Sequence, residues 1–180
     1  RADVALILLD AVEGVTAQDT KIGGDAHEAG CASVLVVNKW DCRAGKPGAA
    51  EEFRLAVQER FKYLAYAPMA FVSALTGHRV MHLFPLIDTV AAERERRIPT
   101  PELNAVIQEA VTRRPPPADR GRQVRVRYVT QVGVKPPTFL CFGTAAGGLH
   151  FSYLRYLENC LRKAYRFRGT PIRLLVRGRQ

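Results

Sequence analysis

The stretch at residues 33–41, SVLVVNKWD, decides the fold of the first half of the chain. Four branched or long apolar residues in a row are typical of a strand that is buried on both faces of a parallel sheet. The polar side chains that follow lie where this strand ends, and in open α/β sheets ligands bind at the carboxyl ends of strands. We therefore predict a buried strand at 33–37 with a binding loop, residues 38–41, directly after it.

Two more short apolar runs and three longer amphipathic segments flank this strand. The apolar runs, residues 4–9 and 70–72, have the character of buried strands. The amphipathic segments are predicted helices and cover residues 18–29, 51–64 and 80–97. The resulting order β-α-β-α-β-α predicts an α/β domain, residues 1–97, with a parallel sheet and helical crossovers.

A second unit begins at a break in composition, residues 97–101 (RIPTP). Its first helix is predicted to start at a cap, Thr100, and to end before the prolines at 115–117. A second helix is predicted over residues 151–166, with Phe151 on its buried face. Strands are predicted at residues 123–132, 138–142 and 171–177. The order α-β-β-α-β predicts a small α+β domain over residues 98–180.

The positive charge of the chain is concentrated in this second unit. The 180 residues carry 27 Lys and Arg against 17 Asp and Glu, a formal net charge of +10. Residues 1–97 hold 12 basic and 13 acidic side chains, whereas residues 98–180 hold 15 basic and 4 acidic ones, a net charge of +11. This excess indicates a polyanionic partner for the second unit, such as a nucleic acid. All apolar runs are too short to cross a bilayer.

The cysteines and histidines do not form a pattern that is typical of a metal site. Cys31, Cys42, Cys141 and Cys160 fit neither a CxxC pair nor a compact disulfide framework, and free thiols in a reducing cytosol are the favoured interpretation. His78 and His82 have the spacing of two ligands on one helix, but no third ligand is evident, which favours a solvated or packed pair.

Polar motifs follow two successive predicted strands. Residues 38–41 have the pattern NKxD, and residues 73–77 (SALTG) have the pattern SAxxG. The carboxylate of Asp41 can accept both the ring N–H and the exocyclic amine of guanine, a donor pair that adenine lacks. This pair of motifs resembles the base-binding half of the translation-factor-like GTPases, in which backbone N–H groups at 73–75 would contact the guanine carbonyl. The candidate residues for GTP or GDP are Asn38, Lys39, Asp41, Ser73, Ala74 and Leu75.

Longer segments narrow the resemblance. They are residues 10–19 (DAVEGVTAQD), 100–104 (TPELN), 128–139 (YVTQVGVKPPTF), 151–159 (FSYLRYLEN) and 169–173 (GTPIR). With them, essentially the entire chain resembles the Der family of bacterial ribosome-assembly GTPases, also called EngA, in which two G domains precede a KH-like domain. The resemblance implies that residues 1–97 are the later half of a second G domain and that residues 98–180 are a KH-like domain, with neighbouring G domains in a parent chain. It also implies a cytoplasmic location and a function on the large (50S) ribosomal subunit and its rRNA.

The sequence departs from the family pattern at the phosphate end of the nucleotide. No G-x-x-x-x-G-K-[ST] motif is present, and no DxxG motif that would help to hold Mg²⁺. We therefore expect a fragment of a longer GTPase that holds the guanine end only. It should have no catalytic residue, no GTPase activity of its own, weak nucleotide affinity and no metal, with Mg²⁺ bound only in the complete parent.

The basic residues of the second unit alternate with apolar ones. The alternation places Val124, Val126 and Tyr128 on one face of a strand and Arg125 and Arg127 on the other. The candidates for RNA contact are Arg125, Arg127, Arg155, Arg162, Arg173 and Arg177, and four of them gather on one sheet face if their strands are neighbours. KH domains clamp RNA with a GxxG loop, which residues 147–150 do not match, so any RNA contact would use another mode. A solvated basic face and an aromatic base-stacking platform are the alternatives.

Two functions remain open from the sequence. In the first, the chain is part of a GTP-hydrolysing assembly factor whose KH-like unit contacts rRNA. In the second, it is a noncatalytic RNA-binding module with a vestigial α/β scaffold. Sequence upstream of Arg1 would distinguish them, because only the first function needs the phosphate-binding motifs in frame.

Overall fold

The computed structural model describes residues 2–43, 45–118, 123–143 and 149–178. Two compact units make up the chain, and each is described separately. The first contains Arg1–Arg94 together with Arg168–Pro171, and the second contains Glu95–Phe167 and Ile172–Gln180.

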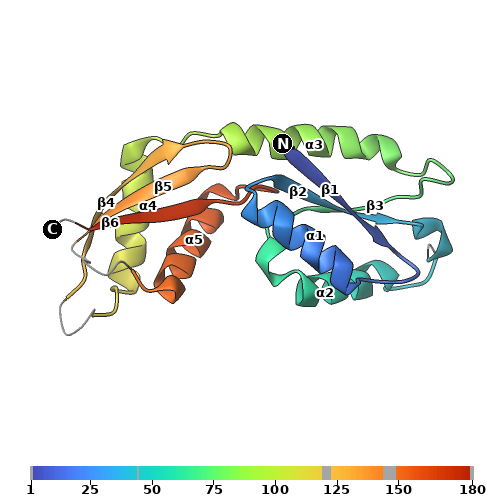
Figure 1. The fold of residues 1–180 in the computed structure, drawn as a ribbon, viewed down its shortest axis with the longest axis horizontal. Helices are drawn as coiled ribbons and strands as arrows, with labels where there is room; N and C mark the ends of the chain where they lie inside the picture. The colour runs from blue at the N-terminus through green and yellow to red at the C-terminus, as the bar shows by residue number, and fades with distance from the viewer. Residues whose placement is uncertain (1, 44, 119–122, 144–148, 179–180) are drawn as a thin grey trace. The chain divides into compact units, whose positions relative to one another are not determined.

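The first unit is an α/β domain with a parallel sheet, as the sequence predicts (Figure 1). Its strands are β1 (Val4–Asp10), β2 (Ala32–Asn38) and β3 (Met69–Phe71), in the order β1-β2-β3. Its helices are α1 (Ala17–Glu28), α2 (Ala49–Arg60) and α3 (Leu83–Glu95), with 3-10 turns at Trp40–Cys42, Lys62–Leu64 and Val80–His82. The predicted β-α-β-α-β-α order is thus confirmed.

The central strand β2 is buried on both faces. Leu35 and Val37 pack into a cluster with Phe53 of α2, while Val34 and Val36 pack into another that includes Val90 of α3. A strand in this position has no exposed face, which explains why its sequence is a continuous apolar run.

The short segment Arg168–Pro171 belongs to the first unit, where Gly169 forms two backbone hydrogen bonds. The N–H of Ser33 donates to the carbonyl of Gly169 over 2.7 Å, and the N–H of Gly169 donates to the carbonyl of Tyr66 over 2.9 Å. Gly169 has a φ of +71°, and a Cβ atom there would lie 2.2 Å from Cγ1 of Val90. Only glycine fits this position without strain.

Gly169→Ala is therefore expected to lower the free energy of unfolding by about 1–3 kcal/mol, since it adds both a backbone strain and a steric clash. Gly24→Ala is the matched control: Gly24 lies in α1, and a Cβ there meets no atom within 4 Å. This control should raise the stability by about 0.5–1 kcal/mol. Urea titration of the whole chain measures both, and equal effects would contradict the contact made by Gly169.

The second unit has the predicted order α-β-β-α-β. Its elements are α4 (Thr100–Arg113), β4 (Val126–Gly133), β5 (Thr138–Gly143), α5 (Phe151–Tyr165) and β6 (Arg173–Gly178). Strand β5 lies in the middle of the sheet, antiparallel to β4 and parallel to β6. The core combines Leu103 and Ile107 of α4, Leu157 and Leu161 of α5, and inward residues of the strands such as Phe139. Both helices thus contribute to one core on one face of the sheet.

Three local predictions for the helices are wrong. Pro99 takes the cap position of α4, and Thr100 is already helical. Phe151 is 72% exposed, and Tyr153 occupies the core position instead, where its hydroxyl donates to the carbonyl of Arg114 over 2.7 Å. The α-helix predicted to start at residue 80 starts later: Val80–His82 form a 3-10 turn, and α3 follows at Leu83–Glu95.

A β-bulge in β4 changes the predicted alternation. Val126 pairs with Gly143 and Tyr128 pairs with Phe142, which leaves Arg127 as an extra residue. Val124 and Val126 are buried as predicted, but Tyr128 is turned away from them and is 42% exposed. After the bulge Val129, which is fully buried, takes the next inward position.

Candidate functional site

The predicted site residues of the first unit lie together at the carboxyl ends of its strands. Asp10 and Asn38 are register partners at the ends of β1 and β2. Backbone hydrogen bonds connect the segment after β3 with β2 and the loop after it. The N–H of Trp40 donates to the carbonyl of Val72 over 3.0 Å, and the N–H of Val72 donates to the carbonyl of Val37 over 2.8 Å. The parallel sheet therefore brings the two polar motifs to one edge.

Asn38 links the two motifs directly. Its side-chain Oδ1 accepts a hydrogen bond from the backbone N–H of Ala74 over 2.9 Å. Its backbone carbonyl accepts another from the N–H of Ala11, also over 2.9 Å. Asn38 thus positions the SAxxG loop relative to β2, and its side-chain NH₂ is the donor left for a ligand.

Lys39 forms an ion pair with Asp10. The ammonium Nζ lies 2.6 Å from Oδ2 of Asp10, whose Oδ1 accepts the N–H of Val12 over 2.7 Å. The hydrogen bond from Lys39 lowers the pKa of Asp10, and the same contact raises the pKa of Lys39. Asp10 was not predicted as a site residue; its place at the end of the first apolar run, in register with Asn38, is the signal that could have indicated it.

Asp41 presents an ionised carboxylate to solvent. It lies in the 3-10 turn Trp40–Cys42, which is anchored by the buried ring of Trp40 against Phe71, 4.3 Å between centroids. The hydroxyl of the buried Ser73 lowers the pKa of Asp41 below its ordinary value. The carboxylate is therefore charged at neutral pH, with two oxygens that can accept the paired donors of a base.

The backbone amides of 73–75 have other partners than the sequence suggests. The N–H of Ser73 donates to the carbonyl of His78 over 3.1 Å, and that of Ala74 donates to Asn38. Among these three described residues, Leu75 alone donates no backbone hydrogen bond within the protein, and its side chain is 88% exposed. Two of the three amides thus have partners within the protein, and their contact with a ligand stays a prediction.

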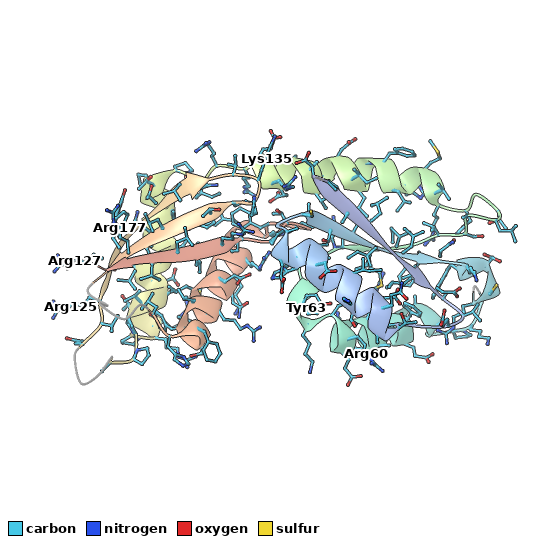
Figure 2. All side chains as sticks on the ribbon, in the orientation of Figure 1. Arg60, Tyr63, Arg125, Arg127, Lys135 and Arg177 are labelled. Atoms are coloured by element: carbon cyan, nitrogen blue, oxygen red, sulfur yellow. The ribbon has the colours of Figure 1, made fainter. Side chains whose placement is uncertain are left out.

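The predicted RNA-contact residues are not all equivalent. Arg125, Arg127 and Arg177 lie at one end of the sheet, where β4 begins and β6 ends (Figure 2). Arg173 starts β6 at the opposite end, so the expected group of four does not form, because β5 separates β4 from β6. Arg155 is exposed on α5.

Arg162 has a structural role in the second unit. Its side chain is only 15% exposed, and its Nε lies 3.0 Å from Oε1 of Glu158. Its Nη1 also donates to the carbonyl of Phe167 over 3.3 Å. These bonds hold the end of α5, and they leave little of Arg162 for contact with a ligand.

Within the described ranges, no three His, Cys, Asp or Glu side chains are grouped to hold a metal ion. No helix in those ranges is long and apolar enough to span a bilayer. All four cysteines are free thiols, of which Cys42, next to Asp41, is exposed.

Two protein-family models match the two units in turn. The Elongation factor Tu GTP binding domain matches residues 1–95. The KH-domain-like family of EngA bacterial GTPase enzymes, C-terminal, matches residues 97–177. The chain is therefore part of a GTP-binding domain followed by a KH-like domain.

Relatives named GTPase Der share about half of its residues. The protein from Moorella thermoacetica is 51% identical over 98% of the chain, and that from Ruminiclostridium cellulolyticum is 49% identical over 100%. The chain belongs to the GTPase Der family, as its sequence motifs predict, and it spans only 40% and 41% of these two relatives. A crystal structure of Era from Aquifex aeolicus aligns with 97% of the chain and 64% of its own, at 18% identity and a TM-score of 0.40, too low to add to this assignment.

Asn38→Ala should loosen the SAxxG loop in the isolated chain. It removes the acceptor for the N–H of Ala74, a bond whose net contribution is ~1 kcal/mol. We expect hydrogen exchange of the Ala74 amide to become several-fold faster. Leu75→Ala, which removes a side chain exposed to solvent, is the control and should leave that rate unchanged; equal rates in all three proteins would contradict the link.

Proposed function

We propose that the chain supplies the guanine-recognising end of a GTP-binding, GTP-hydrolysing protein that acts in the biogenesis of the large ribosomal subunit in the bacterial cytoplasm. One observation carries the proposal: Asn38 fixes the loops after β2 and β3 to each other, with the ionised carboxylate of Asp41 exposed beside them. A rigid acceptor pair at the end of a parallel sheet suits a planar base with two adjacent donors.

The rest of the nucleotide would be bound elsewhere in a longer protein. Phosphate binding needs a helix N-terminus or a loop of free amides, and Mg²⁺ needs oxygen ligands near the phosphates. The 180 residues contain no G-x-x-x-x-G-K-[ST] motif for either task. Hydrolysis and metal binding are therefore assigned to residues outside this sequence.

Asp41→Asn, made in the full-length parent protein, tests the assignment of the base. An amide places a donor against a donor of guanine, so GTP affinity should fall about tenfold or more. Xanthosine triphosphate, which offers an acceptor at that position, should gain affinity. Glu13→Gln is the control, since Glu13 is an exposed carboxylate on the neighbouring loop. Unchanged GTP affinity in Asp41→Asn, without a gain for the xanthine nucleotide, would remove the assignment.

We also propose that the second unit contacts rRNA. Its net charge of +11 over residues 98–180 supports this, as does the gathering of Arg125, Arg127 and Arg177 at one end of the sheet (Figure 2). Arginines bind phosphate oxygens through fixed pairs of N–H donors. The contact would be electrostatic in its first stage and independent of a GxxG loop.

The salt dependence of RNA binding measures these contacts. The logarithm of affinity should fall with the logarithm of salt concentration by about 0.7 for each phosphate neutralised on a single strand. Replacing Arg125 and Arg127 together by Ser should therefore flatten the slope by about 1.4. Arg113→Ser is the control, because Arg113 is paired with Glu109 over 2.6 Å on α4. Affinity that does not change with salt would show that the charge serves another purpose.

A further inference from the structure

The sheet of the second unit has one face that its helices do not cover. Inward residues such as Val129, Phe139 and Cys141 pack with α4 and α5 in the core. Cross-strand partners point to the same side, so the opposite face is made of rows of paired residues. One row is Tyr128, Phe142 and Arg177, and the next is Thr130, Leu140 and Leu175.

An aromatic pair lies at one end of this open face. The rings of Tyr128 and Phe142 are stacked, with centroids 5.3 Å apart and planes inclined by 29°. Tyr128 reaches this face only because the bulge at Arg127 reverses the alternation of β4. A large ring that is 42% exposed on a sheet surface, and turned there by a bulge, offers a flat apolar surface to a ligand.

The charge around the pair is positive. Arg177 is the cross-strand partner of Phe142, and Arg127 precedes Tyr128 on β4; both are exposed. None of the three strands contains an acidic residue. A ligand of this face must therefore combine a flat apolar group with negative charge, which is the chemistry of an unpaired nucleotide.

The edge of β4 is closed to an added peptide strand. The side chain of Asn104 both donates to the carbonyl and accepts from the N–H of Val129, each over 2.8 Å. Gln108 donates to the carbonyl of Arg127 over 3.2 Å. These side chains of α4 occupy backbone groups that β-strand addition would need. A hollow of about 750 Å³ lies beside them, between α4 and residues 123–128. Arg125 and Arg127 are among the residues that line it.

We propose that this open sheet face is a stacking platform for unpaired bases of single-stranded RNA. One base stacks on Tyr128 and Phe142, and the flanking phosphates bind Arg177 and Arg127. This proposal rests on the RNA contact proposed above. It adds that the bound bases are unpaired and that they bind to the open face of the sheet. It requires no clamp by a GxxG loop, because stacking and charge together orient the strand.

Tyr128→Leu in the whole 180-residue chain tests the platform. Leucine keeps an apolar contact with Phe142 but offers no ring, so the affinity for a labelled single-stranded oligo(U) should fall roughly tenfold. The salt slope should not change, because no phosphate contact is lost. Tyr128→Phe should restore wild-type affinity, which would show that the ring rather than the hydroxyl is needed. Phe151→Leu is the matched control, since Phe151 is an exposed aromatic residue on α5, and it should bind as the wild type does.

The outcomes separate this inference from the function on which it rests. If Tyr128→Leu binds oligo(U) as tightly as wild type while Arg125→Ser/Arg127→Ser binds weakly, the platform is overturned and the RNA contact stands. Binding of an RNA duplex that equals binding of the single strand would also overturn the platform, because paired bases cannot stack on it. If the wild-type chain binds no RNA at any salt concentration, the RNA contact fails and the platform with it. A thermal melting curve of each variant that matches wild type shows that these comparisons are made on folded protein.

Discussion

The burial of β2 on both faces is the constraint on which the first unit depends. Leu35 and Val37 pack towards α2, and Val34 and Val36 pack towards α3, so neither face of the strand reaches water. Its backbone groups must then find partners within the protein: β1 pairs with the whole of β2, β3 pairs with residues 35–37, and the carbonyl of Gly169 accepts the N–H of Ser33. Polar side chains can follow only where the strand leaves the core. The location of the candidate site is thus a consequence of the same packing that forms the sheet.

The site is held in place mainly by polar contacts within the protein. Asn38 bonds to Ala74, Lys39 bonds to Asp10, and the hydroxyl of Ser73 lowers the pKa of Asp41. Groups that are already fixed lose little conformational freedom when a ligand binds, so the site is suited to selecting a base. It is less suited to tight binding on its own, because the strongest contacts of a nucleotide are made by its phosphates. Selectivity and affinity would then come from different parts of a longer protein.

The sequence predicts the order of elements well because that order depends on local patterns. Apolar runs, periodic helices and proline breaks are all visible within about 15 residues. The phase of an element is harder to predict when it depends on a distant partner. The bulge at Arg127 is set by the pairing of β4 with β5, and the burial of Tyr153 in place of Phe151 involves core residues and a carbonyl, that of Arg114, far away in the sequence. The ion pair of Glu158 with Arg162 is different, because the two residues are four apart on one helix and the sequence pattern could have indicated it.

The distribution of acidic residues explains why the arginines of the sheet in the second unit are not neutralised by carboxylates of the same strands. Glu109 and Glu158 lie on the helices and pair with Arg113 and Arg162, one turn further along, so each helix neutralises part of its own charge. Strands β4 and β6 contain arginines, and none of the three strands contains a carboxylate. Charge alone attracts a polyanion without fixing its orientation, since phosphates repeat along any strand. An aromatic pair at the positive end of the sheet supplies the missing directional contact, because a base stacks only where a ring is presented. Because of the bulge, Tyr128 lies on the open face of the sheet instead of in the core. There its ring adds a directional contact to a charged surface.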